Sequence, residues 1–392
     1  MRGAMLALLC CAAVLAGCQR AVQPAAPSAT LGLPGVPYPA AGAPSQAVVD
    51  LGRKLFMDRR LSSNNTLSCA MCHVPEQGFA AVELATAVGI EGRSLRRNAP
   101  TLLNVAYVRE LFHDGRSDSL EHQAWAPLLN PIEMGNPATV DVIKKIGAMP
   151  DYAGRFEATF GAAGVSESTV GAALAGYQRS LVAGGSRFDR WRYGGDKAAL
   201  NASERAGFAV FAGKGRCIAC HSVGEKEALF ADGRFHNTGI GFGRYQGAHD
   251  PAHRYVVQLA PGVVTELRDS DLASVSEPAQ EDTGRHEVTG KPGDKWAYRT
   301  PTLRNVALTA PYMHDGSLAT IEEVVEYYQH GGIDNPGKDP LVQPLALSAK
   351  DKRDLAAFLR SLTGSNVAAL AKQARAERID MPIPLSDGAG EK

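Results

Sequence analysis

The sequence predicts a mainly α-helical protein built of two domains that are related by internal duplication. Two Cys-x-x-Cys-His pentapeptides, Cys69–His73 and Cys217–His221, lie in different halves of the chain. Downstream of them Pro100–Ala106 is repeated as Pro301–Ala307, 201 positions later. Few segments alternate apolar and polar residues as strands do, and Gly and Pro interrupt the chain throughout. A chain of 392 residues is long enough for two domains with cores of their own.

The first 18 residues are typical of a secretory signal peptide. Arg2 is followed by an apolar run, Met5–Leu15, which is too short to anchor the chain across a bilayer. The run leads into Leu-Ala-Gly-Cys, which resembles a bacterial lipobox, so we expect Cys18 to be lipidated. The alternative is an ordinary cleaved signal in which Cys18 has no role. Gln19 favours the outer membrane, and we expect a periplasmic protein whose only membrane attachment is this lipid.

Composition and the repeat together predict the domain boundaries. Residues 19–45 are rich in Ala, Pro and Gly and are expected to form a tether. An N-terminal domain over 46–200, a C-terminal domain over 201–365 and a tail over 366–392 follow it. The motif histidines are only 148 positions apart, less than the spacing of the downstream repeat. The C-terminal domain should therefore carry a loop-rich insertion, at about 230–295.

A short amphipathic helix is expected before each motif. Apolar residues recur there at helical spacing, and Ser203 is the expected N-cap of the second helix. The apolar positions are Val48, Leu51 and Leu55 in the first helix and Phe208, Val210 and Phe211 in the second.

The two pentapeptides predict covalent haem attachment. The cysteines of such a motif can form thioethers to the haem vinyl groups, and the adjacent histidine then becomes an axial iron ligand. Zinc knuckles or a thioredoxin-like pair are the alternatives, but neither needs a histidine directly after the second cysteine. We therefore expect two cytochrome c-like domains, with haems at Cys69, Cys72 and His73 and at Cys217, Cys220 and His221.

Cysteine usage and charge agree with an exported haem protein. Of the seven cysteines, three (Cys10, Cys11 and Cys18) belong to the signal segment and the motifs take the rest, so no pair remains for a disulfide. Lys and Arg together number 41, as do Asp and Glu, which gives no indication of nucleic acid as a partner.

The repeat also predicts that the two haems differ. Tyr328, on the helix after the second His-Asp-Gly turn, corresponds to Pro127 in the first half. Tyrosine can ligate ferric iron as a phenolate, whereas proline cannot ligate at all. The first haem should therefore keep an open face, with Glu133 above it and Gln123 nearby.

The chain resembles the bacterial di-haem cytochrome c peroxidase and MauG family over roughly residues 45–365. Besides the two pentapeptides, the resemblance rests on four long stretches, which are Arg97–Thr101, Asn130–Met134, Phe235–Gly239 and Thr300–Asn305 running on to Gly316.

This resemblance implies roles for several residues. Glu133 would be the acid/base residue at the peroxidatic haem, with Gln123 as its polar neighbour. Tyr328 stands where some members place a ligating Met and MauG a ligating Tyr, while Met313 is an alternative sixth ligand. A Ca²⁺ site between the halves would use Asn98 with the backbone carbonyls of Thr309 and Pro311.

Three departures from the family pattern bear on function. Many peroxidases of the family carry a His that blocks the first haem until reduction, but Gly89–Arg93 contains none, so this haem should be open at rest. The bridging Trp of the family is replaced by His113. Tyr328 in place of Met should lower the potential of the second haem.

Three functions follow from this pattern. The first is reduction of hydrogen peroxide at the N-terminal haem, with electrons from a small periplasmic cytochrome c or cupredoxin that enter through the C-terminal haem. The second is a MauG-like oxidation of a residue in a protein substrate. The third is a non-catalytic electron-transfer cytochrome, which Glu133 and the Pro127 side of the first haem fit poorly.

Overall fold

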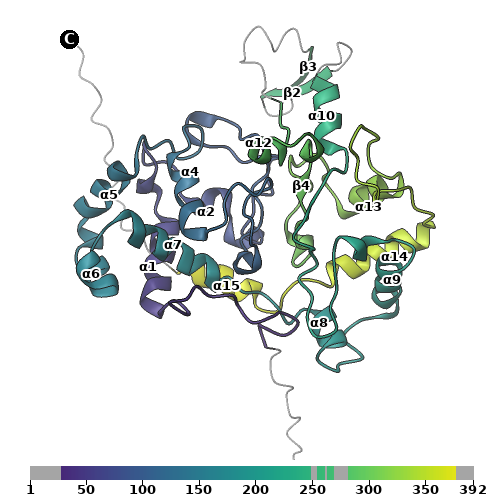
Figure 1. Ribbon diagram of the computed structural model, residues 1–392, viewed down its shortest axis with the longest axis horizontal. Coiled ribbons are helices and arrows are strands. Elements are labelled where there is room, and N and C mark those ends of the chain that lie inside the picture. Colours follow the sequence, from purple (N-terminus) through teal and green to yellow (C-terminus); the bar gives the residue numbers. More distant parts are fainter. Residues whose placement is uncertain (1–27, 249–253, 261–262, 269–280, 377–392) are drawn as a thin grey trace, which may run out of the picture.

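The computed structural model describes residues 28–248, 254–260, 263–268 and 281–376. The expected signal peptide and Cys18 lie outside these residues. In Figure 1 the N-terminal half, purple to blue, lies beside the mostly green C-terminal half. Helices and loops form most of both halves, and strands form two small antiparallel pairs in the described chain. No helix in these ranges is both long and apolar enough to cross a membrane.

The N-terminal half is organised around the packing of two helices, α1 (Gln46–Met57) and α7 (Glu167–Ser180). The hydroxyl of Ser45 accepts a hydrogen bond from Val48 N and so caps α1. A Cβ at Gly52 would lie 1.9 Å from the carbonyl oxygen of Ala173, so only glycine permits this close approach. The other helices of this half are α2 (Cys69–Cys72), α3 (Leu120–Gln123), α4 (Trp125–Leu129), α5 (Thr139–Ala148) and α6 (Arg155–Phe160).

The C-terminal half uses a similar pair, α9 (Ala202–Ala212) and α14 (Ala349–Arg360). Here a Cβ at Gly207 would lie 2.0 Å from the carbonyl oxygen of Asp354. The N-cap of α9 is Asn201, in a capping box with Glu204, whereas the expected cap Ser203 donates a 2.6 Å hydrogen bond to Asp354 instead. The half also contains α8 (Arg187–Arg192), α10 (Ile240–Ala248), α12 (His286–Thr289) and α13 (Ile321–Gln329).

Local backbone geometry recurs at positions 201 residues apart. Asn104 and Asn305 both adopt left-handed backbone angles, with φ of 63° and 62°, directly before a 3₁₀ turn. An isolated bridge joins Leu111 to Ser117, and another joins Tyr312 to Leu318. The aligned positions of the sequence repeat therefore share conformation.

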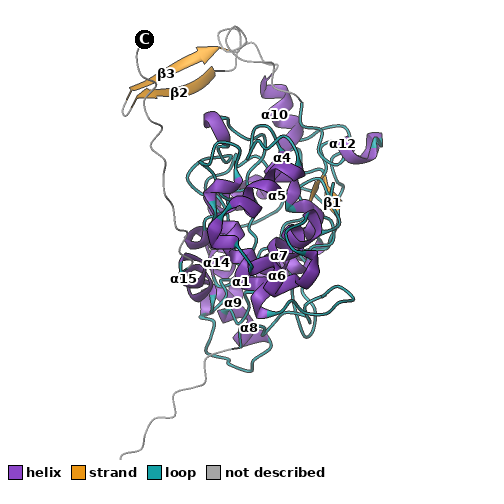
Figure 2. Ribbon diagram, turned by 90° about the vertical axis from the view of Figure 1, so that its left-hand side faces the viewer, coloured by secondary structure: helices purple, strands orange, loops and turns teal. Residues whose placement is uncertain are grey.

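The segment from the second motif to β4 contains two antiparallel pairs of strands. Strands β1 (Phe235–His236) and β4 (Tyr298–Arg299) pair antiparallel within the body. Strands β2 (Arg254–Ala260) and β3 (Val263–Arg268) form a separate antiparallel ribbon, which Figure 2 shows standing away from the helical body.

The two ends of the described chain cross between the halves. The carbonyl of Gly32 accepts hydrogen bonds from Ala228 N and from the buried side chain of Arg304, and Pro34 accepts one from the Tyr107 hydroxyl. The composition of 19–45 predicts a free tether, but this part of it is packed because its backbone carbonyls serve as partners for the body. Similarly, α15 (Val367–Arg375) lies in the expected tail yet packs into the N-terminal core (Figure 1).

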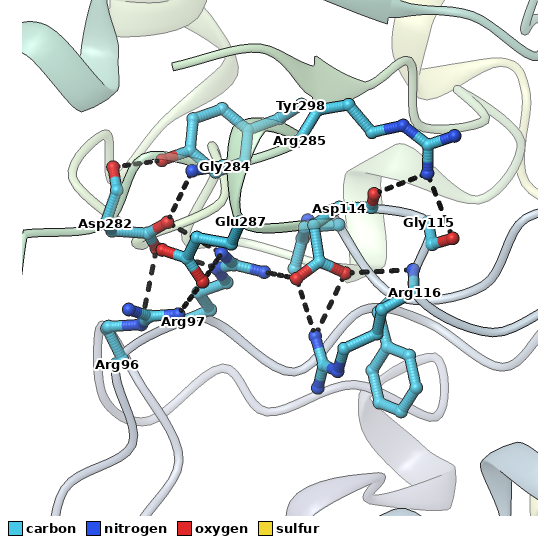
Figure 3. A network of polar contacts seen from close by, with 12 residues as sticks. Arg96, Arg97, Asp114, Gly115, Arg116, Asp282, Gly284, Arg285, Glu287 and Tyr298 are labelled. Carbon is cyan, nitrogen blue, oxygen red and sulfur yellow. Dashed lines mark hydrogen bonds and ion pairs between the residues drawn. The ribbon is translucent and has the colours of Figure 1, made fainter. Parts of the chain in front are cut away.

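A network of ion pairs joins the N-terminal half to the segment before β4 (Figure 3). The guanidinium of Arg97 contacts Asp114 at 2.5 Å and Asp282 at 2.6 Å, and Arg96 contacts Glu287 at 2.6 Å. Both aspartates are buried, so each carboxylate depends on its arginine partners for compensation of its charge. The network fixes the segment before β4 against the first half.

Candidate functional site

The first Cys-x-x-Cys-His motif forms a single helical turn. Cys69 is the first and Cys72 the last residue of α2, and neither thiol is in a disulfide. Burial raises the pKa of Cys69 to about 12 and that of Cys72 to about 11, so neither is a reactive thiolate. The Nδ1 of His73 lies 3.2 Å from the carbonyl oxygen of Phe79, which leaves Nε2 as the ligand nitrogen. Burial also lowers the pKa of His73 and so favours the neutral imidazole that binds iron.

The second motif has the same arrangement. Cys217–Ala219 form a 3₁₀ turn, and the thiols of Cys217 and Cys220 are again free. The Nδ1 of His221 lies 2.9 Å from the carbonyl oxygen of Phe230, and burial lowers the pKa of the ring. Each motif thus presents two unpaired thiols and one oriented, neutral histidine.

These donor sets fit c-type haems. Two thiols for the vinyl groups and one histidine whose second nitrogen is held by a carbonyl are the groups that such a haem requires. In the first half the hydroxyl of Tyr177, on α7, is buried and has no hydrogen-bond partner among the described residues. It lies near enough to Cys69 for that thiol to contribute to its raised pKa. A buried, unsatisfied hydroxyl beside the motif is understandable if a polar group of the cofactor lies there.

Glu133, the predicted acid/base residue, lies near the first motif. Burial raises its pKa, and the opposing effects of Arg116 and of a hydrogen bond from Asn130 do not cancel this. Its charge also contributes to the raised pKa values of Cys69 and Cys72, so the carboxyl lies near these thiols. Asn130 Nδ2 donates to Glu133 Oε1 at 2.8 Å, and Oε2 remains for another partner.

Gln123 is less closely tied to this group. It ends α3 and is half-buried, and among the described residues no hydrogen bond joins its side chain to Glu133. Arg116, which sequence reasoning did not single out, affects the Glu133 pKa directly. The sequence could have pointed to Arg116 because it directly follows the first His-Asp-Gly turn.

The segment Gly89–Arg93 packs directly on the backbone beside Glu133. Ile90 N donates to Glu133 O at 2.9 Å, and a Cβ at Gly89 would lie 1.7 Å from the carbonyl oxygen of Ile132. The segment that lacks the blocking histidine is therefore fixed close to the acid/base candidate.

Tyr328 lies beside the second motif. Burial chiefly raises its pKa, with further contributions from Tyr327, Cys220 and Cys217. The phenol is half-buried and lies near both thiols. Met313, the alternative ligand, stands in a left-handed turn with φ of 72°, the counterpart of Phe112 at 65°.

Asn98, a proposed calcium ligand, is buried at the boundary between the halves. Its backbone N–H donates to His314 O at 2.7 Å, and its Nδ2 donates to Ala85 O at 2.8 Å, which leaves Oδ1 for a cation. Thr309 follows the 3₁₀ turn Val306–Leu308, and Pro311 follows a cis peptide bond. Amide and carbonyl oxygens of this kind suit a hard cation.

The repeat histidines both contribute to this boundary. His113 Nε2 lies 2.9 Å from Asn98 O, and burial lowers the pKa of the ring to about 4. The ring of His314 stacks on Tyr298 with centroids 3.6 Å apart, and burial lowers its pKa as well. Both rings are therefore neutral, and both hold backbone or side chains together at this boundary.

His236 has two carboxylate partners that the sequence did not indicate. Its Nδ1 lies 2.5 Å from Asp339 and its Nε2 lies 2.8 Å from Asp232. A hydrogen bond with Cys220, followed by those with the two aspartates, raises its pKa to about 10. Cys220, Asp232 and His236 resemble a metal site in spacing, but Cys220 belongs to the second motif. Both ring nitrogens of His236 therefore have carboxylate partners.

Comparison with known proteins gives consistent matches. The model of the family described as di-haem cytochrome c peroxidase matches residues 46–198. The methylamine utilization protein MauG of Methylorubrum extorquens is 37% identical over 332 residues, which cover 83% of this chain and 81% of that protein. The cytochrome-c peroxidase IdrP1 of Denitromonas iodatirespirans is 35% identical over 364 residues, 91% of each chain.

Solved structures agree with these relatives. A MauG-like protein associated with microbial copper homeostasis superposes with a TM-score of 0.68 at 32% identity, over 86% of this chain and 95% of that one. The diheme peroxidase BthA from Burkholderia thailandensis superposes with a TM-score of 0.67 at 27% identity, over 83% and 87% of the two chains.

Proposed function

The chain belongs to the di-haem cytochrome c peroxidase and MauG family, whose members are haem oxidoreductases, and on this premise we propose that it reduces hydrogen peroxide to water in its N-terminal half. The observation that carries the proposal is the half-buried Glu133, whose carboxyl has a raised pKa and lies near the cysteines of the first motif. A non-catalytic cytochrome has no need of such a group.

The residues of the two motifs would hold the cofactors. Cys69, Cys72 and His73 would bind one haem, and Cys217, Cys220 and His221 the other. When bound, the haems supply the iron at which peroxide is cleaved and the electrons that this cleavage consumes.

Glu133 would move the proton during this reaction. Its Oε1 is held by Asn130, so Oε2 is the atom that accepts a proton from one peroxide oxygen and returns it to the departing oxygen, which leaves as water. Burial keeps the carboxyl pKa above its ordinary value and so closer to the working pH, where a proton can be both accepted and returned. Gln123 would assist as a polar neighbour that orients peroxide or water.

The C-terminal half would deliver electrons. We propose Tyr328, with Met313 as the alternative, as sixth ligand of the second haem, and a small periplasmic cytochrome c or cupredoxin as donor. Asn98 with the carbonyls of Thr309 and Pro311 would hold Ca²⁺ between the halves. The shared geometry at Asn104 and Asn305 supports an origin of the two halves by duplication.

The address of the protein is proposed from its N-terminus. The signal-like segment ending at Cys18 supports export to the periplasm and a lipid anchor, with Gln19 favouring the outer membrane. Mass spectrometry of the mature N-terminus tests this, because lipidation adds acyl chains to Cys18 and a Cys18→Ala variant would lose them. An unmodified mature N-terminus beyond Cys18 would contradict the anchor.

Substitution of Glu133 tests the peroxidase function. Glu133→Gln keeps the size and the contact with Asn130 but cannot exchange a proton, so peroxide turnover should fall by roughly 10²–10⁴-fold. Glu91→Gln is the matched control, since Glu91 is exposed in the neighbouring segment and pairs with Arg93. Steady-state rates with peroxide and reduced cytochrome c, together with haem content, provide the measurement. Turnover near that of the control, with both haems attached, would remove Glu133 from the mechanism.

A MauG-like activity is the second candidate, and two observations favour it. Tyr328 lies beside the second motif, and Gly89–Arg93 contains no blocking histidine. The same steady-state assay separates the two functions, because a MauG-like enzyme would consume peroxide without sustained oxidation of cytochrome c. A resting electron paramagnetic resonance spectrum with only low-spin ferric haem would contradict both and support electron transfer alone.

A further inference from the structure

Arg299 is an arginine at the boundary whose charge has no carboxylate partner. It ends β4, and its backbone N–H donates to His113 O at 2.8 Å. Its Nε donates to Phe112 O at 3.1 Å and its Nη1 to Thr300 O at 3.4 Å. Both acceptors are neutral backbone carbonyls, and no carboxylate oxygen of the described residues lies within 4.0 Å of this guanidinium.

This situation is exceptional in the part of the chain that the structure describes. Among the arginines whose side chains the structure describes, every other one that is not exposed has a carboxylate partner, namely Arg53, Arg60, Arg96, Arg97, Arg179, Arg190, Arg285 and Arg304. Burial lowers the pKa of Arg299, and the distant charge of Glu110 offsets this only in part. Glu110 itself pairs with Arg285 at 2.6 Å. A desolvated cation without an anion is unfavourable, which points to an anionic partner that is not among the described residues.

The chain around Arg299 lies next to the second motif. Arg299 pairs in the β1–β4 sheet with Phe235, and the next residue of β1, His236, lies beside Cys220. Two residues after Arg299, the backbone of Pro301 interacts with the ring of His221. In the first half the corresponding residue is Asn98, which carries no charge. The cation is therefore particular to the second half.

We propose that Arg299 binds a propionate carboxylate of the haem that is attached at Cys217 and Cys220. A guanidinium has five N–H donors, of which the two carbonyls use two, and the remaining fork matches the two oxygens of a carboxylate. The positive charge favours the reduced iron, so Arg299 raises the potential of the second haem relative to a neutral residue. The inference rests on the haem attachment in the proposed function, but it does not depend on peroxide turnover.

Spectroelectrochemical titration of the holoprotein tests this role, with the two haems followed separately. Arg299→Gln should shift the midpoint potential of the C-terminal haem downward and leave that of the N-terminal haem unchanged. Arg299→Lys, which keeps the charge but loses the fork, should shift it less in the same direction. Arg234→Gln is the control, because Arg234 is an exposed arginine next to β1. Haem content, measured on each variant, separates loss of the cofactor from a change in its potential.

Four results would overturn the proposal. The first is an Arg299→Gln protein with full haem content and the potentials of the control. The second is a shift confined to the N-terminal haem. If Arg299→Gln fails to retain its haems, the third such result is an Arg299→Lys protein in which the midpoint potential of the C-terminal haem is unchanged.

Titration of the wild type with and without acetate distinguishes the source of the carboxylate. Potentials that do not depend on acetate support the propionate, whereas a dependence that Arg299→Gln abolishes would assign the site to a free carboxylate and overturn the proposal.

Discussion

At the scale of single residues, Glu133 combines two properties that oppose each other. Burial makes its carboxyl a better proton carrier near neutral pH, and the same burial makes the ionised form less stable in the fold. A carboxyl whose folded pKa is raised contributes stability below its unfolded pKa and loses it as the pH rises through the folded value. The residue that serves the reaction should therefore weaken the fold at neutral pH.

Thermal unfolding of Glu133→Gln provides a test of this cost. Glutamine stays neutral and can keep an oxygen toward Asn130, so the variant should melt above the wild type at neutral pH. The gain should vanish below the ordinary pKa of glutamate, where Glu133 is protonated in both the folded and unfolded states. Circular dichroism melts across this pH range measure the difference, with Glu91→Gln beside it. A Glu133→Gln melting temperature at or below that of the wild type at neutral pH would contradict this account.

The sixth ligand of the second haem is a second prediction at this scale. Burial raises the pKa of the Tyr328 phenol, so without an iron to bind it would stay protonated at physiological pH. Tyr328→Phe should therefore change the resting electron paramagnetic resonance spectrum of the second haem. Tyr327→Phe is the matched control, because that hydroxyl already donates to Thr238 O at 2.5 Å. A spectrum changed by Met313→Leu but not by Tyr328→Phe would instead assign the thioether.

Prediction of single residues from the sequence is possible where one short segment contains the whole signal. The motif cysteines and histidines are contiguous, and Glu133 follows Asn130 within one turn. The partners of His236 could not be foreseen in the same way, because Asp339 lies 103 positions away and meets the ring only after folding. The lack of a carboxylate partner for Arg299 likewise becomes visible only in the folded chain, once the side chains of the described residues are placed around it.

At the scale of secondary structure elements, helices were predictable where apolar spacing and caps agreed. The expected helices before the motifs are present as α1 and α9, but α9 begins at Asn201 because Asn201 and Glu204 cap each other. The β2–β3 ribbon was not expected, since its apolar residues do not alternate regularly. The segment around Gly32 was expected to be a free tether, because nothing local indicates that Arg304, 272 positions away, needs its carbonyl.

Glycine substitutions test the close helix pairs. Gly52→Ala would bring Cβ to 1.9 Å from Ala173 O, so α1 and α7 must separate, at a cost of roughly 1–3 kcal/mol in the free energy of unfolding. Gly147→Ala is the matched control, because Gly147 lies within α5 with open space around it. There alanine should stabilise by about 0.5–1 kcal/mol. Denaturant unfolding of both variants gives the comparison, and equal effects of the two would contradict the packing argument.

At the scale of the whole molecule, each half depends on a segment from the opposite end of the chain. The turn at Gly32 supplies a carbonyl to Arg304, whose guanidinium also pairs with buried Asp189 at 2.9 Å. In return, α15 places Val367 and Ala374 in the hydrophobic core of the N-terminal half. The ion network at Arg97 then closes the boundary between them (Figure 3). The halves of the repeat are therefore not expected to unfold independently.

A charge placed on the inner face of α15 tests this dependence. Ala374→Asp would bury an unpaired carboxylate in the N-terminal core, which should lower the free energy of unfolding by on the order of 3 kcal/mol. Ala369→Asp is the matched control, because it makes the same change on the exposed face of the same helix. Hydrogen exchange should show protection lost first in α1 and α7, although the substitution lies near the C-terminus. Loss confined to α9 and α14, or an equal effect of Ala369→Asp, would show that α15 belongs energetically to the C-terminal half.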